Sequence, residues 1–219
     1  MKVSRYPQRS EEWHQARLGL PTASNASKLI TPAGKRSTTA KTYLRQLAWE
    51  RVTGETGSSD YVSAAMRDGI EREDDAADAC AKALGLTLET VGLCTTDDGR
   101  FGASFDRLVK GTSEAVEIKC PTGPTHVGYL LDGCDDYRAQ IAAQFMVSKF
   151  DRIHFWSYHP QCPSYHTVFT YLEFRPFIAL LDEIVREFCD ALDNAEKKLR
   201  AMDWTWDRGL TNWTGDEPW

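Results

Sequence analysis

Asp106, Glu117 and Lys119 stand at a spacing that could bind a metal ion. Asp106 lies before a segment of turn composition around Gly111 and Thr112, and the other two residues follow that segment. If the turn is centred between Gly111 and Thr112, residues whose numbers sum to 223 face each other across a β-hairpin, and Asp106 faces Glu117. Directly opposed residues have Cβ atoms about 4.5–5.5 Å apart, so the two carboxylates would repel each other unless a cation lay between them. The spacing therefore predicts a site for a divalent cation.

The residue types in this cluster suit the cleavage of phosphodiester bonds with a metal ion. Strand alternation would place Lys119 on the same face as Glu117 and turn the Ile118 side chain away, which leaves the Ile118 carbonyl as a further ligand. Oxygen ligands of this kind suit Mg²⁺, with Mn²⁺ as a substitute. The metal would orient a hydroxide for in-line attack, and Lys119 would stabilise that nucleophile or the developing negative charge. A surface ion pair on an ordinary amphipathic strand is the alternative for so short a motif.

The elements that must position these residues can be placed from capping and periodicity. Helices are expected from a cap at Ser10 to Gly19, from a cap at Thr22 or Ser24, and over 41–52, 62–84 and 175–202, with two more between 126 and 150. Strands are expected over 86–95, 101–109, 115–119, 152–158 and 167–171. This order predicts a single-domain α/β fold with a central mixed β-sheet flanked by helices. We assign 1–203 to that domain and 204–219 to a Trp-rich C-terminal tail.

Length and composition agree with one globular domain. The 219 residues, 42% of them hydrophobic, are within the range of a single α/β domain. No segment reaches the length of a membrane span and no signal-peptide pattern opens the chain, so we expect a cytoplasmic protein without membrane association. The six cysteines are scattered and form no CxxC pair, which argues against disulfide frameworks, zinc sites and an iron–sulfur cluster.

Charge is distributed unevenly along the chain. Residues 1–54 contain ten Lys and Arg and three Asp and Glu, whereas 55–219 contain sixteen basic and twenty-nine acidic residues. The net charge of −6 thus combines a basic N-terminal part with an acidic remainder. Such asymmetry indicates a face that neutralises DNA phosphates or, as the alternative, a solvated basic helix. Lys35 and Arg36, on a Gly-containing loop, are candidates for nonspecific contact with the DNA backbone.

Four separated blocks of the chain resemble a known family. The blocks are Glu12-Trp13-His14-Gln15-Ala16-Arg17-Leu18-Gly19 with Thr22-Ala23-Ser24, Gly69-Ile70-Glu71, Ala103-Ser104-Phe105-Asp106 with Val116-Glu117-Ile118-Lys119-Cys120-Pro121, and Tyr137-Arg138-Ala139-Gln140. In order and spacing, from about Glu12 to His159, they resemble the phage lambda-type exonuclease family, the viral recombinase branch of the PD-(D/E)XK nuclease superfamily. The resemblance implies a restriction-endonuclease-like (PD-(D/E)XK) core. Family members commonly have proline before the first aspartate, where this chain has Phe105.

The resemblance also implies roles for residues outside the hairpin. Glu71 would be an additional metal ligand, and Gln140 would orient the attacking water or the substrate. Arg17 and Ser24 would form a pocket for the 5′-phosphate of the degraded strand, which agrees with the preference of arginine forks and helix-start hydroxyls for phosphate oxygens. Without the resemblance, Glu71 would belong to a solvated acidic helix face and Arg17 would be an ordinary surface residue.

The function implied by the resemblance is a Mg²⁺-dependent 5′-to-3′ exonuclease. Such an enzyme digests one strand of linear double-stranded DNA and leaves a 3′ overhang for single-strand-annealing homologous recombination. Relatives are ring-shaped homotrimers that work with a single-strand annealing protein, so we expect both here, together with a phage or prophage origin and a bacterial host. Two alternatives stay open. An endonuclease of the same superfamily would cut closed circular DNA, and a noncatalytic DNA-binding protein would have little need for the Asp106, Glu117 and Lys119 set.

Four tryptophans mark the C-terminal tail. Trp204, Trp206, Trp213 and Trp219 lie in a segment rich in Thr, Asp and Gly. Large aromatic residues in such a setting mark an interface or fold back on their own domain, and the sequence leaves both interpretations open.

Overall fold

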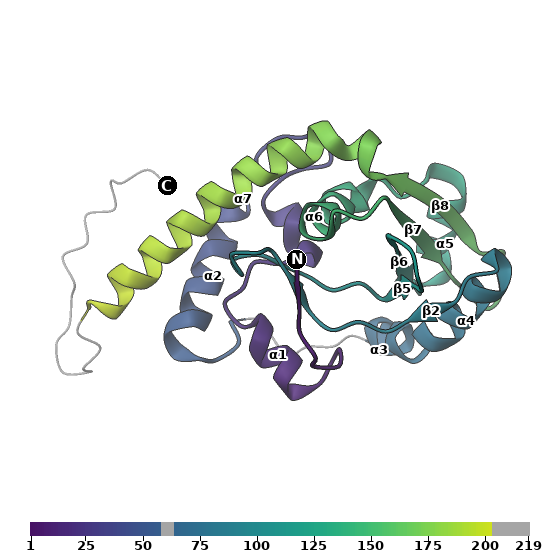
Figure 1. The fold of residues 1–219 in the computed structure, drawn as a ribbon, viewed down its shortest axis with the longest axis horizontal. Coiled ribbons are helices and arrows are strands. Elements are labelled where there is room, and N and C mark those ends of the chain that lie inside the picture. The colour runs from purple at the N-terminus through teal and green to yellow at the C-terminus, as the bar shows by residue number, and fades with distance from the viewer. Residues whose placement is uncertain (58–63, 203–219) are drawn as a thin grey trace.

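The larger sheet of the described residues is a five-stranded mixed β-sheet with helices around it (Figure 1). The computed structural model describes residues 1–57 and 64–202, so the predicted Trp-rich tail over 204–219 lies outside the described residues. In spatial order, the strands of the sheet are β2 (Leu88–Glu89), β5 (Arg107–Val109), β6 (Glu114–Lys119), β7 (Arg152–Ser157) and β8 (Tyr165–Thr170). Strands β6 and β7 run parallel, and the other neighbouring pairs are antiparallel. The predicted α/β fold with a central mixed sheet is confirmed.

A second sheet has three short strands. They are β1 (Lys2–Val3), β3 (Cys94–Thr95) and β4 (Gly102–Ala103). The strands predicted over 86–95 and 101–109 are wrong in extent, because each divides into two short strands that belong to different sheets. Between β4 and β5 the chain leaves the ladder at Phe105, whose side chain is buried and whose carbonyl accepts a 2.6 Å hydrogen bond from Gln8 Nε2. This detour places Asp106 at the start of the β5–β6 hairpin.

Helices flank the sheet. They are α1 (Glu11–Arg17), α2 (Ala40–Thr53), α3 (Ala64–Glu71), α4 (Glu73–Leu84), α5 (Gly123–Asp132), α6 (Arg138–Ser148) and α7 (Tyr171–Arg200), with 3-10 helices η1 (Ala23–Lys28) and η2 (Asp135–Tyr137). The helix predicted over 62–84 is two helices in its described part, separated at Arg72, because three acidic residues form the first turn of α4 and favour a helix N-terminus there. Helix α7 begins earlier than predicted because Thr170 and Glu173 form a capping box. None of the helices in residues 1–57 and 64–202 combines the length and apolarity that a membrane span needs.

Two hydrophobic clusters hold the helices to the sheet. The larger joins α2, α6 and α7 to the face of β6 that carries Ala115, and the smaller packs α4 against Val116 and Ile118 on the opposite face. Because successive strand residues alternate between faces, Glu117 points to the same side as Ala115. Helix α6, buried along almost its whole length, therefore supplies the side chains that meet Glu117.

Candidate active site

The β5–β6 hairpin brings Asp106 and Glu117 together. Arg107 pairs with Val116, so the predicted register sum of 223 is confirmed. Asp106 stands immediately before β5, and its Oδ2 accepts a 2.6 Å hydrogen bond from the backbone N–H of Ile118. The Asp106 carboxylate is thereby held beside the strand that carries Glu117.

Glu117 is almost fully buried, with 2% of its surface exposed. Its Oε1 accepts hydrogen bonds from the Lys119 ammonium and from Gln140 Nε2, the latter at 2.6 Å. Its Oε2 accepts one from Gln144 Nε2 at 2.5 Å. The structure thus brings Lys119 and Gln140 to the carboxylate, although the predicted role of Gln140 in orienting water or substrate stays a prediction. Three donors compensate for the burial of a charged group.

We call the side chains gathered around Glu117 the carboxylate cluster: Asp106, Glu117, Lys119, Gln140 and Gln144. The sequence interpretation gave Gln144 no role. It is fully buried one helical turn after Gln140, so both amides project from one face of α6. Its Nε2 also lies 3.3 Å from the Ser104 carbonyl, whereas its Oε1 has no hydrogen-bond partner among the described residues. The four-residue spacing of two glutamines on a largely apolar helix was the available signal. Buried amides at such a spacing are expected to share a polar partner.

Burial and charge together set the protonation of the cluster. Burial, and then the negative charge of Glu117, raise the pKa of Asp106 well above its usual range, and the charge of Lys119 opposes this shift. Burial disfavours the Lys119 ammonium, but the carboxylates of Glu117 and Asp106 outweigh it and raise the pKa of Lys119 above its ordinary value. Lys119 is therefore a cation at neutral pH. A cation between the carboxylates would restore the ionised form of Asp106.

The donor set suits a hard divalent ion. Asp106 and Glu117 supply carboxylate oxygens, and the Ile118 carbonyl is the predicted third donor. Mg²⁺ commonly takes only one or two protein carboxylates and completes its octahedron with water and phosphate. Within 1–57 and 64–202, no group of three or more His, Cys, Asp and Glu side chains is placed to hold a metal ion. The acidic donors that the described structure brings together are therefore the carboxylates of Asp106 and Glu117.

Helix α3 lies next to the end of β6, but its last residue, Glu71, is exposed. A Cβ at Gly69 would lie 3.2 Å from the Cys120 carbonyl, which shows how closely the two segments approach. The acidic residue on this side whose charge reaches Asp106 is Glu73, which raises the pKa of Asp106 further. The Glu73 side chain is 14% exposed and forms ion pairs with Arg9 and Arg107. Metal ligation by Glu71 stays a prediction.

Arg17 joins the predicted phosphate pocket to the carboxylate cluster. Its Nη2 donates to Ser24 Oγ at 3.2 Å, and its Nη1 donates to Ser104 Oγ at 3.1 Å. The guanidinium also stacks 4.3 Å from the centre of the Trp13 ring, and burial lowers the pKa of Arg17 without removing its charge. Ser104, like Gln144, is a residue to which the sequence interpretation gave no role, and the available signal was its place two residues before Asp106. An arginine and two hydroxyls converge here.

The match to a family model decides the family of this chain. Residues 12–151 match the YqaJ-like viral recombinase domain. The chain belongs to this family. The matched segment contains both Arg17, the residue predicted to bind phosphate, and the carboxylate pair Asp106 and Glu117. The resemblance to the phage lambda-type exonuclease family is confirmed. Comparison with the curated proteins finds no match.

Among the solved structures similar to this chain are exonucleases. The complex of LHK-Exo with dAMP is 29% identical, covers 87% of this chain and 96% of its own, and gives a TM-score of 0.77. A second structure of this alkaline exonuclease, from Laribacter hongkongensis, is 26% identical, covers 87% and 98% of the two chains, and gives 0.72. A phage related exonuclease from Haemophilus somnus 129PT, 16% identical over 80% and 95% of the chains with a TM-score of 0.61, shares the fold. The predicted PD-(D/E)XK-like architecture is confirmed, and the family implies a nuclease.

Phe105 occupies the position where members of the family commonly have proline. The residue is fully buried, and its ring packs 5.5 Å from that of Phe150. Together with the bond from Gln8 to its carbonyl, this packing fixes the backbone before Asp106. Side-chain burial here replaces the restriction that a proline ring would impose.

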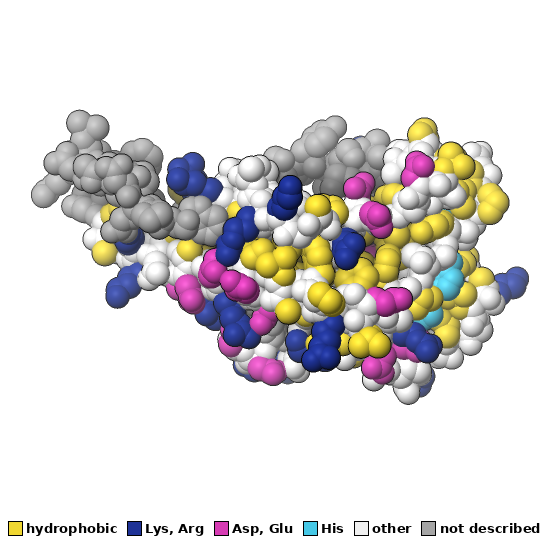
Figure 2. Space-filling model, turned by 90° about the horizontal axis from the view of Figure 1, so that it is seen from above, with side chains coloured by type: hydrophobic (Ala, Val, Ile, Leu, Met, Phe, Trp, Pro, Cys, Tyr) yellow, Lys and Arg dark blue, Asp and Glu magenta, His cyan; other side chains and the backbone are white. Residues whose placement is uncertain are grey.

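The basic N-terminal part of this chain is partly neutralised by acidic residues of the same protein. Arg36 pairs with Glu187 of α7 at 2.6 Å, and Arg9 and Arg51 also bind acidic residues from later in the chain. On the face seen in Figure 2, Lys and Arg side chains are interspersed with Asp and Glu. Lys35 and Arg36 are both exposed, and no hydrogen bond or ion pair among the described residues connects Arg36 with the carboxylate cluster. Their contact with DNA stays a prediction.

Proposed function

We propose that the protein is a Mg²⁺-dependent exonuclease that digests one strand of linear double-stranded DNA from its 5′ end. The observation that carries this proposal is the bond from Arg17 to Ser104, since a single residue separates Ser104 from Asp106. A terminal phosphate held by Arg17 and Ser24 would lie beside the carboxylate cluster. The phosphodiester nearest the 5′ end would then be presented for cleavage, and a 3′ overhang would remain.

The carboxylate cluster supplies the hydrolytic part of the proposal. Asp106 and Glu117 would hold Mg²⁺ with the Ile118 carbonyl and with Glu71. When bound, Mg²⁺ supplies an activated water nucleophile for attack at phosphorus. Mn²⁺ would substitute because it accepts the same oxygen donors.

The remaining cluster residues would support the reacting groups. Lys119, kept as an ammonium by its two acidic neighbours, would stabilise the negative charge that develops on the phosphate oxygens. Gln140 and Gln144 hold both oxygens of Glu117 in place, so the carboxylate would need little rearrangement during the reaction. The amide of Gln140, on the more open side of the cluster, would also orient the attacking water or the substrate.

Similarity to LHK-Exo supports the choice of product. That protein was crystallised with dAMP, a deoxynucleoside monophosphate, which is the product class expected when single nucleotides are released from a 5′ end. For this chain we propose release of mononucleotides, a homotrimeric ring around the duplex, and a single-strand annealing protein as partner in homologous recombination. A phage or prophage gene acting in the cytoplasm of a bacterial host fits this role.

The experiment that tests the function compares DNA ends. Linear duplexes carrying a 5′-phosphate or a 5′-hydroxyl, and a covalently closed circle, are incubated with the protein in Mg²⁺ and in EDTA, with Lys119→Ala as the inactive control. We expect Mg²⁺-dependent loss of the phosphorylated strand, an intact circle, and retention of the 3′-ended strand. Cleavage of the circle would establish an endonuclease instead. Absence of cleavage in Mg²⁺ and in Mn²⁺ would leave a DNA-binding protein.

A further inference from the structure

Gly19 lies between the two residues that we propose to bind the terminal phosphate. Arg17 is the last residue of α1, the chain turns at Gly19, and Ser24 follows in η1. The φ angle of Gly19 is 68°, and a Cβ at this position would lie 2.4 Å from Arg51 Cγ. Both the left-handed conformation and the close approach require glycine. The turn that relates Arg17 to Ser24 is therefore built directly against α2.

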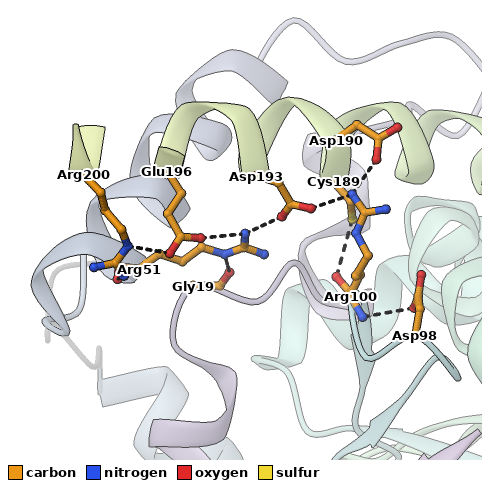
Figure 3. Close-up of polar contacts among 9 residues, drawn as sticks. All are labelled: Gly19, Arg51, Asp98, Arg100, Cys189, Asp190, Asp193, Glu196 and Arg200. Carbon is orange, nitrogen blue, oxygen red and sulfur yellow. Dashed lines mark hydrogen bonds and ion pairs between the residues drawn. The ribbon is translucent and has the colours of Figure 1, made fainter. Parts of the chain in front are cut away.

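Two consecutive residues of α2 bind both polar backbone atoms of Gly19. Its N–H donates to Glu50 Oε2 at 2.9 Å, and its carbonyl accepts from Arg51 Nε at 2.8 Å, as Figure 3 shows for Arg51. Glu50 is 6% exposed, and its Oε1 accepts from Gln46 Nε2 at 2.9 Å and from the Gly57 N–H at 3.2 Å. The buried carboxylate is fully paired, so its own position is fixed.

Helix α7 fixes Arg51 in turn. Arg51 Nη1 contacts Asp193 Oδ1 at 2.7 Å and Glu196 Oε2 at 3.2 Å (Figure 3). Arg200 donates to the Arg51 carbonyl at 2.6 Å and to Glu196 Oε1 at 2.8 Å. The guanidinium of Arg51 thus lies between the Gly19 carbonyl and two carboxylates of α7. It connects the longest helix of the described structure to the turn after Arg17.

The side chain of Arg17 borders open space on one side. A cavity of about 170 Å³ is lined by Arg17, His14, Thr22, Tyr43 and Glu50, among others. The contacts that hold the guanidinium are the Trp13 ring, 4.3 Å away, and the hydroxyls of Ser24 and Ser104. Trp13 and Ser24 belong to the segments on either side of Gly19, so the direction of the Arg17 side chain depends on the backbone that Gly19 joins.

We propose that Glu50 and Arg51 are positioning residues for recognition of the DNA end: by holding Gly19 they aim Arg17 and Ser24 at a single phosphate. This inference rests on the proposed function, in which Arg17 binds the 5′-phosphate. Neither residue would touch DNA or take part in hydrolysis. Loosening Gly19 would weaken discrimination between 5′-phosphate and 5′-hydroxyl ends, since misplacement by about 1 Å can cost a preorganised site up to a hundredfold.

The test uses Arg51→Lys and Glu50→Gln, with Arg100→Lys as the matched control. Arg100 pairs with the same Asp193, at 2.9 Å, and with Asp190 at 2.6 Å, but its side chain is paired with α7 and not with Gly19. Lysine at 51 keeps the charge facing α7 but has no Nε–H to donate beside the Gly19 carbonyl. In Glu50→Gln the single amide oxygen is expected to face the two donors at Oε1, which turns the amide NH₂ toward the Gly19 N–H.

The readout is the ratio of kcat/KM on 5′-phosphorylated and 5′-hydroxyl duplexes, measured for the full chain in Mg²⁺ beside Arg17→Ala. We expect Arg51→Lys and Glu50→Gln to lower this ratio by about tenfold or more, mainly through KM on the phosphorylated duplex, with the 5′-hydroxyl rate unchanged. Arg100→Lys should keep the wild-type ratio. Binding of a 5′-phosphorylated oligonucleotide in Ca²⁺ gives the same comparison without turnover, and thermal unfolding verifies that each variant is folded.

Different outcomes overturn different statements. If Arg17→Ala abolishes the preference while both α2 variants retain it, the positioning role is wrong and the proposed function stands. Equal losses in Arg100→Lys and Arg51→Lys would mean that the α7 network acts on overall stability, which also overturns the positioning role. A wild-type protein without any preference for the 5′-phosphate would overturn end recognition itself, and the positioning role with it.

Discussion

Asp106 accepts a 2.6 Å hydrogen bond from the backbone N–H of Ile118, the residue between Glu117 and Lys119. This bond orients the Asp106 carboxylate before any ion is bound, because its donor belongs to the neighbouring strand of the same sheet. The bond does not compensate for burial beside a second carboxylate, and the pKa of Asp106 stays raised. The Asp106 carboxylate is thus oriented for a metal ion before the ion binds. Burying it beside Glu117 lowers the stability of the metal-free protein.

The first prediction concerns Asp106→Asn in EDTA between pH 4 and pH 8. In the unfolded chain the carboxyl ionises near its ordinary pKa of about 3.9, whereas burial and the charge of Glu117 raise its pKa in the folded state. The stability contributed by the protonated form is complete below the unfolded pKa and is lost as pH rises toward the folded pKa. Asparagine does not titrate and still accepts from Ile118. The Tm of the wild type should therefore fall relative to that of Asp106→Asn as pH rises.

Thermal unfolding by circular dichroism measures this difference. Two Tm curves that stay parallel from pH 4 to pH 8 would contradict the raised pKa of Asp106. Addition of Mg²⁺ at pH 8 provides the control, since ligand binding stabilises only the state that binds it. We expect Mg²⁺ to raise the Tm of the wild type and to leave Asp106→Asn nearly unchanged.

The second prediction separates two roles for Lys119. Its pKa is raised by Glu117 and Asp106 in spite of burial, so a neutral amine that could accept a proton is rare near pH 8. Lys119→Ala should lower kcat by about 10²–10³-fold, the effect typical of losing one group that stabilises developing charge, and should change KM for DNA little. Rates from pH 7 to pH 9.5 measure this. Recovery of the variant at high pH, where hydroxide replaces a general base, would indicate proton transfer by Lys119 instead.

Contacts between residues that lie close together in the chain could be predicted from the sequence. The turn between Asp106 and Glu117 fixes one register, and alternation along β6 then assigns Glu117 and Lys119 to one face. Helix α1 likewise begins at its predicted cap, where Ser10 Oγ accepts from the Trp13 N–H at 3.2 Å. These features depend on a few adjacent residues and on backbone geometry, so one sequence is sufficient.

Contacts between distant segments were not predictable in the same way. The bond from Arg17 to Ser104 spans 87 positions, and the bond from Gln144 to Glu117 spans 27. Whether Glu71 or Glu73 lies nearer to Asp106 depends on the break between α3 and α4 at Arg72. The sequence pattern of a helix continues across this break, so the break could not be predicted. Each of these relationships is set by packing of whole elements. The family resemblance identified Arg17 as a candidate site residue, but only the fold shows that Ser104 is the second hydroxyl that Arg17 binds.

The third prediction concerns Gln144→Leu. This change removes a donor from Glu117 Oε2 and, at the same time, removes the buried Gln144 Oε1 that has no partner among the described residues. The two effects on stability oppose each other, since each unsatisfied buried group costs about 1–3 kcal/mol. We expect a small change in Tm but a fall in activity of about 10–100-fold, because Glu117 loses an oriented contact. A large loss of Tm with normal specific activity would mean that Gln144 serves packing alone.

The fourth prediction treats the two hydroxyls on Arg17 as a coupled pair. Ser24 and Ser104 accept from different nitrogens of one guanidinium, at 3.2 Å and 3.1 Å. Each Ser→Ala variant should lower the preference for 5′-phosphorylated duplex by about tenfold, as loss of a charge-assisted hydrogen bond worth about 1.5 kcal/mol would. Because both act through Arg17, the double variant should lose less than the product of the single losses. Ser104 also lies next to the segment that carries Asp106, so the 5′-hydroxyl rate must be measured in parallel. If Ser104→Ala reduces both rates equally while Ser24→Ala reduces only one, Ser104 positions Asp106 and does not help Arg17 to recognise the phosphate.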